Sequence, residues 1–288
     1  MQTEWVTINQ VPTKVLTWGK TLSEAKDHAG GDNLNYIVCI CGNPGIPDAY
    51  VEFLEEVHRK TNNVVWILSH AGHSVKNVAD MPVYSENKEL YGLEGQIKHK
   101  IAFIEEYIPE YAKITLIGHS VGSYIILRLL RVPSIHSKVV KSYLLFPTIE
   151  YIGDSPNGKK FMKYTRRFVI QKLVLRIYFK ITDTPLYLLE PIRSFVQPFV
   201  IKSVLGMALQ EMLQIRERDN EILMENSENI KLYYGAEDKW CPLINYYNIK
   251  KDIPDIDAVI CEKGYSHTFV LENSLPLAAL ISNWIQEQ

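Results

Sequence analysis

Short strand-like segments alternate with helix-like segments along most of this 288-residue chain, and this alternation restricts the possible folds more than any other feature of the sequence. Strands are predicted near Ile37, Val64, Ile114, Val140, Lys231 and Ala258, and helices over residues 49–60, 92–106, 121–131, 243–251 and 275–286. Alternating strands and helices build a mostly parallel sheet with helices on both faces. The sequence therefore predicts an α/β fold.

One long interval interrupts the alternation. About eighty residues separate the strand that ends at Pro147 from the one that starts at Ile230, and a single crossover helix needs far fewer. The sequence therefore predicts a core formed by residues 1–147 and 229–288, with a helical cap inserted at 148–228. With 47% hydrophobic residues, the chain can bury a sizeable core as one domain that carries this insertion.

The pentapeptide Gly118-His119-Ser120-Val121-Gly122 connects a strand-like run at 114–117 to a helix-like run at 123–130. A GxSxG sequence in this context is typical of a nucleophile elbow. The serine of an elbow has a strained, sharply turned backbone, and a side chain two residues before or after it would collide with a neighbouring strand or helix. Ser120 is therefore the candidate nucleophile. The alternative is an ordinary helix start with Ser120 as its N-cap.

A nucleophilic serine needs a histidine as base and a carboxylate that orients this histidine, in the chain order serine, acid, histidine. Asp238 and His267 each lie in a loop that follows a predicted strand. Loops beyond the carboxyl ends of parallel strands share one crevice, so both side chains can meet Ser120 there. Glu237 is the alternative acid. Asp238 is favoured because its position in the turn projects the side chain inward. The sequence thus predicts a triad of Ser120, Asp238 and His267.

Other histidines offer competing interpretations. His267 itself could be an ordinary surface histidine. His119 precedes the candidate nucleophile, at a position that usually packs beside an active site without acting as base. His70 and His73 follow an apolar run, and they could line the same crevice or be buried and hydrogen-bonded.

Acyl transfer also requires an oxyanion hole, which normally takes one N–H from the residue after the nucleophile and one from an early strand-to-helix loop. Val121 can supply the first. The second is predicted from the loop 42–45, where Pro44 has no N–H and Asn43 is the best donor. The alternative is an ordinary glycine-rich turn. The loop is too short and wrongly spaced for a GxGxxG motif or a P-loop, which argues against nucleotide binding.

Composition argues against several kinds of partner and cofactor. The net charge of −2 gives no reason to expect a nucleic-acid partner. The four cysteines lack zinc-finger spacing, and Cys39 and Cys41 lie two apart in a predicted strand, which suits core packing better than a disulfide. They indicate a reducing compartment, and no metal or organic cofactor is expected. The amino terminus has no basic region followed by an apolar region, so no signal peptide is expected.

The predicted cap contains a basic and aromatic segment. Residues 159–180 hold eight basic residues and no acidic one, and Lys172, Arg176 and Lys180 recur every four residues on an otherwise apolar helix. Such a helix can lie in a lipid interface with its cations near phosphates. The alternative is a buried cap helix whose cations reach out to solvent. No uncharged apolar run is long enough to predict a transmembrane helix.

Several motifs together resemble the lipid droplet-associated hydrolase family of the α/β-hydrolase superfamily. They are GNPG at 42–45, SHAGH at 69–73, YGLEGQIKHK at 91–100, LIGHSVGSY at 116–124, LLFPTIE at 144–150, SPNG at 155–158, YYG at 233–235 and WCP at 240–242. The resemblance implies an α/β-hydrolase fold with Ser120 as nucleophile, Asp238 as acid and His267 as base. It also implies neutral lipid esters, such as cholesteryl esters, as substrates, and a location at the surface of lipid droplets and of the endoplasmic reticulum membrane.

The functional hypothesis is therefore a serine lipid hydrolase that works through an acyl-enzyme. Two alternatives remain. The chain could tether droplets with weak or no turnover, because a competent triad does not prove that a bulky ester can enter beneath the cap. It could also be an acyltransferase, because the same acyl-enzyme can be captured by an alcohol.

Overall fold

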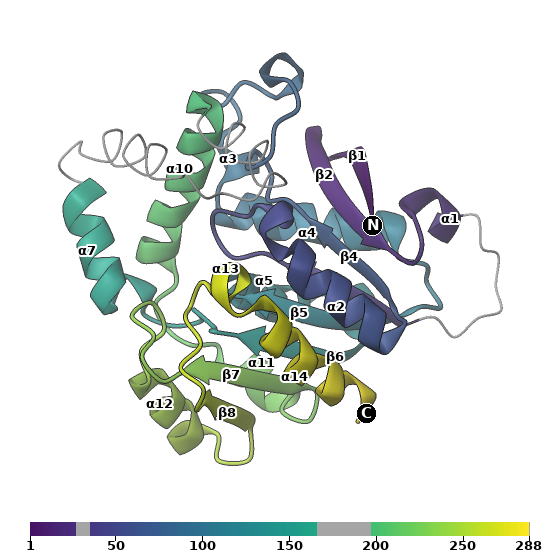
Figure 1. The fold of residues 1–288 in the computed structure, drawn as a ribbon. Helices are drawn as coiled ribbons and strands as arrows, with labels where there is room; N and C mark the ends of the chain where they lie inside the picture. Colours follow the sequence, from purple (N-terminus) through teal and green to yellow (C-terminus); the bar gives the residue numbers. More distant parts are fainter. Residues whose placement is uncertain (27–34, 166–196, 288) are drawn as a thin grey trace.

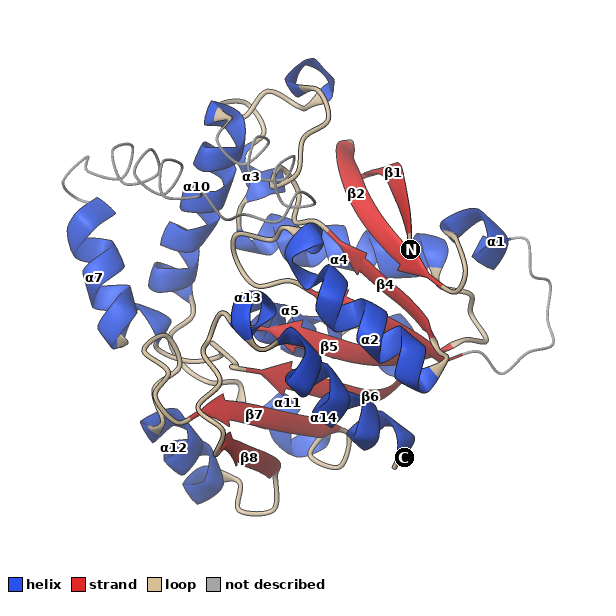
Figure 2. Ribbon diagram, viewed as in Figure 1, coloured by secondary structure: helices blue, strands red, loops and turns tan. Residues whose placement is uncertain are grey.

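An eight-stranded sheet forms the centre of the molecule (Figures 1 and 2). The computed structural model describes residues 1–26, 35–165 and 197–287. The strands are β1 (Gln2–Ile8), β2 (Val11–Trp18), β3 (Asn35–Ile40), β4 (Val64–Leu68), β5 (Lys113–His119), β6 (Val139–Leu145), β7 (Ile230–Gly235) and β8 (Asp257–Cys261). Their order in the sheet is β1-β2-β4-β3-β5-β6-β7-β8. Strands β3 to β8 are parallel, so the predicted α/β fold with a mostly parallel sheet is confirmed.

The first two strands were not predicted. Strands β1 and β2 form an antiparallel hairpin, and β2 pairs antiparallel with β4. The turn of the hairpin is Asn9-Gln10, with φ values of 46° and 69°. Hairpin turns of this kind are usually marked by Asn-Gly or Asp-Gly. Without glycine the turn was not recognised, although Val and Thr are frequent on both sides of it.

The helices cover both faces of the sheet. They are α1 (Leu22–Lys26), α2 (Val51–Thr61), α3 (Lys88–Tyr91), α4 (Leu93–Tyr107), α5 (Val121–Leu129), α6 (Pro133–His136), α7 (Pro156–Thr165), α10 (Pro198–Gln214), α11 (Asn220–Glu225), α12 (Ile244–Asp252), α13 (Phe269–Glu272) and α14 (Ser274–Gln286), with short 3₁₀ helices at Pro47–Tyr50, Val78–Asp80 and Ile152–Asp154. Figure 2 shows α2 and α14 in front of the sheet and α4 and α5 behind it.

Strand β3 illustrates why both faces are covered. Val38 and Ile40 pack in a core cluster with side chains of α4 and α5, whereas Ile37 and Cys39 pack in a second cluster with α2 and α14. Successive side chains of a strand point to opposite faces, so a strand that is buried on both sides is apolar throughout. Cys39 and its neighbour Cys41 share one cluster, and both are free thiols.

Helices α7, α10 and α11 lie between β6 and β7 in the chain, within the predicted insertion at 148–228. In Figure 1, α7 and α10 stand on the side to which the arrowheads of β5, β6 and β7 point. No helix in the described part of the chain is long and apolar enough to cross a membrane. The predicted lipid-surface residues Lys172, Arg176 and Lys180 lie outside the described residues.

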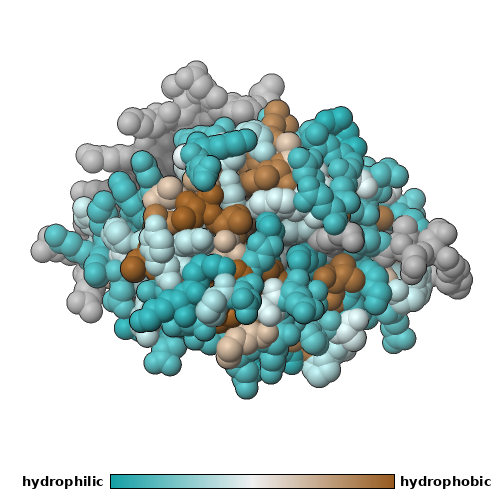
Figure 3. Space-filling view, turned by 90° about the horizontal axis from the view of Figure 1, so that it is seen from below, coloured by the Kyte–Doolittle hydropathy of each residue, from teal (hydrophilic) through white to brown (hydrophobic). Residues whose placement is uncertain are grey.

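Apolar side chains also remain on the surface. On the face seen from below, hydrophilic side chains predominate and apolar ones form separate patches (Figure 3). Exposed large apolar residues include Leu209 and Leu213 of α10, Ile244 and Tyr247 of α12, and Leu271 of α13. Figure 1 places these three helices near the carboxyl ends of the central strands. The molecule therefore presents apolar side chains near the carboxyl ends of the strands, where the candidate site residues were expected.

A buried ion pair joins the chain after α10 to the segment that follows β6. The Arg218 guanidinium donates to Oε1 of Glu150 at 2.8 Å, and it also contacts Asp252 of α12. The side chains of Arg218 and Glu150 are only 4% and 6% exposed. Burial raises the pKa of Glu150, and the neighbouring Arg218 opposes that rise. Arg218 thus links the chain after α10 to the segment after β6 and to the helix after β7.

Replacing Arg218 with methionine is expected to lower the free energy of unfolding by about 3–5 kcal/mol, because it leaves the Glu150 carboxylate buried without its cation. Arg216→Met is the matched control. Arg216 pairs with Asp154, and both side chains are about half exposed, so this loss should cost less than about 1 kcal/mol. Urea unfolding of both variants measures the difference. Equal losses of stability would contradict the structural role of the buried pair.

Candidate active site

Ser120 occupies a sharp turn between strand β5 and helix α5. Its backbone has φ 54° and ψ −122°, in the positive-φ region that residues other than glycine rarely adopt. Its N–H donates to the carbonyl of Leu145 at the end of β6, and its own carbonyl accepts from Ser123 N–H. Hydrogen bonds on both sides therefore hold the strained conformation, as is common at functional sites.

The two glycines of the pentapeptide are required by close packing. A Cβ atom on Gly122 would lie 2.2 Å from the carbonyl oxygen of Ile40 in β3. A Cβ atom on Gly118 would lie 2.7 Å from Cδ1 of Ile126 in α5. Any side chain at either position would displace the strand or the helix next to the turn.

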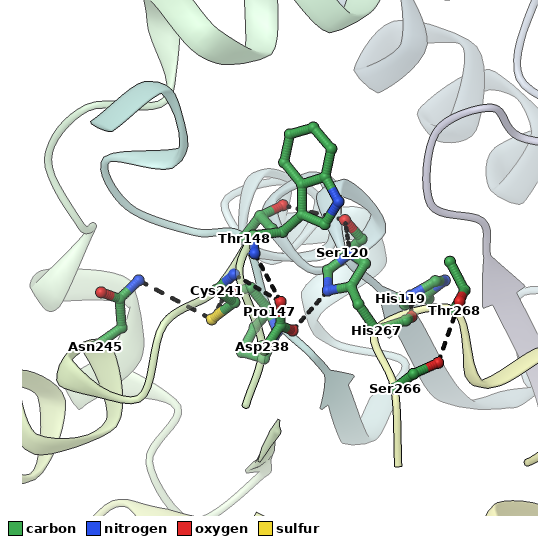
Figure 4. A network of polar contacts seen from close by, with 11 residues as sticks. His119, Ser120, Pro147, Thr148, Asp238, Cys241, Asn245, Ser266, His267 and Thr268 are labelled. Atoms are coloured by element: carbon green, nitrogen blue, oxygen red, sulfur yellow. Dashed lines mark hydrogen bonds and ion pairs between the residues drawn. The ribbon is translucent and has the colours of Figure 1, made fainter. Parts of the chain in front are cut away.

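The side chains of Ser120, His267 and Asp238 form a hydrogen-bonded series, and Figure 4 shows them pointing toward one another. Nε2 of His267 lies 3.0 Å from Oγ of Ser120, and Nδ1 lies 2.6 Å from Oδ2 of Asp238. The three residues come from the turn after β5, the loop after β7 and the loop after β8. The parallel strands thus bring together residues that are up to 147 positions apart in the chain.

Asp238 is the carboxylate that contacts the histidine. Its side chain is 1% exposed, and its other oxygen, Oδ1, accepts N–H bonds from Trp240 at 2.7 Å and Cys241 at 3.1 Å. These bonds fix the orientation of the carboxylate. The neighbouring Glu237, the alternative acid, is exposed to solvent.

His119 is fixed by bonds on both ring nitrogens. The hydroxyl of Tyr50 accepts the N–H of Gly42 at 2.8 Å and lies 2.7 Å from Nδ1 of His119. Nε2 of His119 lies 2.8 Å from the backbone carbonyl of His267. This geometry fits a Tyr50 hydroxyl that donates to Nδ1 and an Nε2–H that donates to the carbonyl. Burial, together with the neighbouring His267, lowers the pKa of His119 to about 3. His119 is therefore neutral, and its bond to the His267 carbonyl supports the loop that carries His267.

The loop at 42–45 lies directly against the nucleophile. A Cβ atom on Gly42 would lie 3.1 Å from Cβ of Ser120. The next peptide bond, between Asn43 and Pro44, is cis. None of the hydrogen bonds formed within residues 1–26, 35–165 and 197–287 uses the N–H of Asn43. No acceptor in the described part of the chain therefore competes with a ligand for this N–H.

His70 and His73 are buried against this loop and contact backbone carbonyls in and next to it. Nε2 of His70 lies 3.1 Å from the carbonyl of Cys41, and Nδ1 of His73 lies 2.7 Å from the carbonyl of Pro44. Both side chains are buried. Burial lowers the pKa of His70 and lowers that of His73 to about 3. Of the two interpretations left open by the sequence, the structure favours the buried, hydrogen-bonded one.

Three residues near the site were not predicted from the sequence. They are Tyr50, Thr148, whose Oγ1 lies 3.5 Å from Oγ of Ser120, and Glu211, whose Oε1 accepts from Asn43. Two signals were present. Thr148 follows the predicted strand near Val140, at the end of the sheet where the site residues were expected. Glu211 is the single acidic residue of α10. Within the described residues, no group of three or more His, Cys, Asp or Glu side chains could hold a metal ion.

Solved structures with the same fold are α/β hydrolases. A haloalkane dehalogenase from Agrobacterium tumefaciens C58 matches with a TM-score of 0.70 and 13% identity, over 99% of this chain and 96% of its own. A thermophilic esterase from Thermogutta terrifontis matches with a TM-score of 0.63 and 17% identity, over 100% of this chain and 99% of its own. At these identities the similarity shows the fold alone.

Similarity in sequence is more specific. Residues 34–270 match the family model described as lipid-droplet associated hydrolase. A lipid droplet-associated hydrolase from Drosophila melanogaster is 36% identical, over 100% of this chain and 99% of its own. The relative from Mus musculus is 36% identical over 96% and 93%, and that from Homo sapiens is 32% identical over 99% and 94%. The chain therefore belongs to the lipid droplet-associated hydrolase family.

Proposed function

We propose that this protein is a serine hydrolase that cleaves carboxylic esters of neutral lipids, such as cholesteryl esters. The observation that carries the proposal is the hydrogen-bonded series of Ser120, His267 and Asp238 at the sharp turn after β5. A serine within reach of a histidine base, whose other nitrogen is held by a buried carboxylate, is the arrangement that activates a hydroxyl for attack on a carbonyl.

The reaction proceeds in two halves. Nε2 of His267 accepts the proton of Ser120 while Oγ attacks the ester carbonyl, and Asp238 stabilises the resulting imidazolium through Nδ1. The N–H groups of Val121 and Asn43 stabilise the oxyanion. His267 then returns the proton to the departing alcohol, which leaves an acyl-serine. Water, activated by the same histidine, releases the fatty acid and restores the serine.

A lipid surface is the proposed place of action. The relatives carry the name lipid droplet-associated hydrolase, and exposed apolar side chains of α10, α12 and α13 lie near the strand ends that carry the site. The basic segment with Lys172, Arg176 and Lys180 adds a sequence-based argument for contact with anionic headgroups. We propose that the protein works at the droplet monolayer and at the endoplasmic reticulum membrane surface.

The test is ester turnover by the purified protein on a panel of substrates. Cholesteryl oleate and triolein in phospholipid-coated emulsions are compared with a soluble short-chain ester, and products are identified with and without added sterol. We expect release of free fatty acid from at least one emulsified ester and a fluorophosphonate adduct that mass spectrometry locates on Ser120. Transfer of the acyl group to the sterol would identify an acyltransferase. An unlabelled protein that turns over none of the esters would favour tethering.

A further inference from the structure

Glu211 of helix α10 is a buried carboxyl group next to the site. Its side chain is almost fully buried, and its hydrogen-bond partner is the uncharged amide of Asn43. Burial raises the pKa of Glu211 to about 7, although a hydrogen bond from Asn43 opposes the rise. A buried carboxyl group without a cationic partner costs stability. The presence of Glu211 at a buried position of α10 therefore calls for a reason other than stability.

The partner of Glu211 is a residue of the loop beside the nucleophile. Nδ2 of Asn43 donates to Oε1 of Glu211 at 2.8 Å and to the backbone carbonyl of Val204 at 3.1 Å. Val204 and Glu211 both belong to α10 and are seven residues apart, two turns on the same face of the helix. Both amide hydrogens of the Asn43 side chain are thus used by the single helix α10.

Because its side chain is held at two points, Asn43 has fewer backbone conformations open to it. The loop touches Ser120 at Gly42, and the N–H of Gly42 is already used by Tyr50. Asn43 supplies the next N–H in the chain. If the Asn43 side chain lost its acceptors, the backbone at this position could rotate, and the N–H would no longer be directed at one point beside the serine.

We propose that Glu211 is a positioning residue: through the side chain of Asn43 it holds the Asn43 N–H toward the oxyanion that forms on the ester. This role rests on the proposed function. Stabilisation of an oxyanion acts on the transition state and not on the bound ester, so its loss appears in kcat with little change in KM. Helix α10 of the insertion would thereby complete the oxyanion hole of the core.

Two variants of equal side-chain length separate this role from packing. Glu211→Gln keeps a carbonyl oxygen as acceptor for Asn43, whereas Glu211→Met keeps the length and removes the acceptor. With a soluble short-chain ester we expect Glu211→Met to lower kcat by about 10- to 100-fold with KM nearly unchanged, because a small misplacement of one donor costs on this scale. Its affinity for a trifluoromethyl ketone, which forms a tetrahedral adduct with the serine, should fall by a similar factor. Glu211→Gln should keep most of the activity.

Asn43→Ala removes the contact with Glu211 together with the bond to the Val204 carbonyl, and it keeps the backbone N–H. We expect it to lower kcat at least as much as Glu211→Met does. The double variant should be no worse than Asn43→Ala alone, because Glu211 acts only through the Asn43 side chain. Additive losses, or equal kcat and ketone affinity in the Gln and Met variants, would overturn the role of Glu211 while wild-type turnover keeps the proposed function intact. A wild-type protein without ester turnover would overturn the proposed function and this role with it.

Discussion

Replacing Ser120 with alanine is expected to lower kcat for a soluble ester by about 10⁴-fold or more and to abolish labelling by a fluorophosphonate probe. The variant keeps the Cβ atom and loses only the oxygen that lies 3.0 Å from Nε2 of His267. Neither the acyl-enzyme nor the phosphonyl adduct can form without that oxygen. Activity and labelling are measured on the same preparation, together with the thermal unfolding temperature.

The matched control is Ser137→Ala, a serine-to-alanine change at an exposed position outside the candidate site. Its turnover and labelling should equal those of the wild type. Undiminished labelling of the Ser120 variant would show that another nucleophile reacts with the probe, and it would contradict the proposed role of Ser120. A large loss in both variants would point to damage to the fold instead.

Replacing Asp238 with asparagine is expected to lower kcat by about 10⁴-fold at neutral pH while the fold is retained. Oδ1 of Asp238 accepts two backbone N–H bonds, from Trp240 and Cys241, so the asparagine oxygen should keep that position. Its NH₂ group would then face Nδ1 of His267 and donate to it. The histidine proton would be forced onto Nε2, which could no longer accept the proton of Ser120.

Glu237→Gln is the control for this experiment. Glu237 is the adjacent carboxylate, and it is exposed to solvent. The turnover of the Glu237→Gln variant should therefore stay within about twofold of the wild type, as expected for a surface change. A steady-state comparison of both variants at pH 7 provides the measurement. A severe loss in Glu237→Gln with a mild one in Asp238→Asn would mean that the sequence and the hydrogen bonds both identified the wrong acid.

Much of the fold could be read from the sequence because the central strands are buried on both faces. Strand β4 is apolar and buried throughout, and β3 is apolar from Tyr36 to Ile40, so both stand out between polar segments. The hairpin of β1 and β2 was missed because its outer strand is half exposed and its Asn9-Gln10 turn lacks glycine. Its position at the sheet edge depends on pairing with β4, which no local pattern reveals.

Part of the candidate site could likewise be predicted from the sequence, and part could not. Ser120, Asp238 and His267 were predictable because each follows a strand of one parallel sheet, and such strands end at a common edge. The contact from Glu211 to Asn43 spans 168 residues and joins two elements that follow no shared repeat or motif. The bonds of His119 to Tyr50 and to the His267 carbonyl likewise depend on how loops pack.

By itself the sequence determined the strand and helix alternation, the turn at Ser120 and the chain order of its partners, because periodicity and glycine placement act over a few residues. Only the tertiary structure decided between Asp238 and Glu237 as the partner of His267, buried His70 and His73 beneath the loop at 42–45, and brought Glu211 to Asn43. These outcomes depend on which side chains meet after distant segments pack. Such contacts are set by the whole fold and leave no local trace.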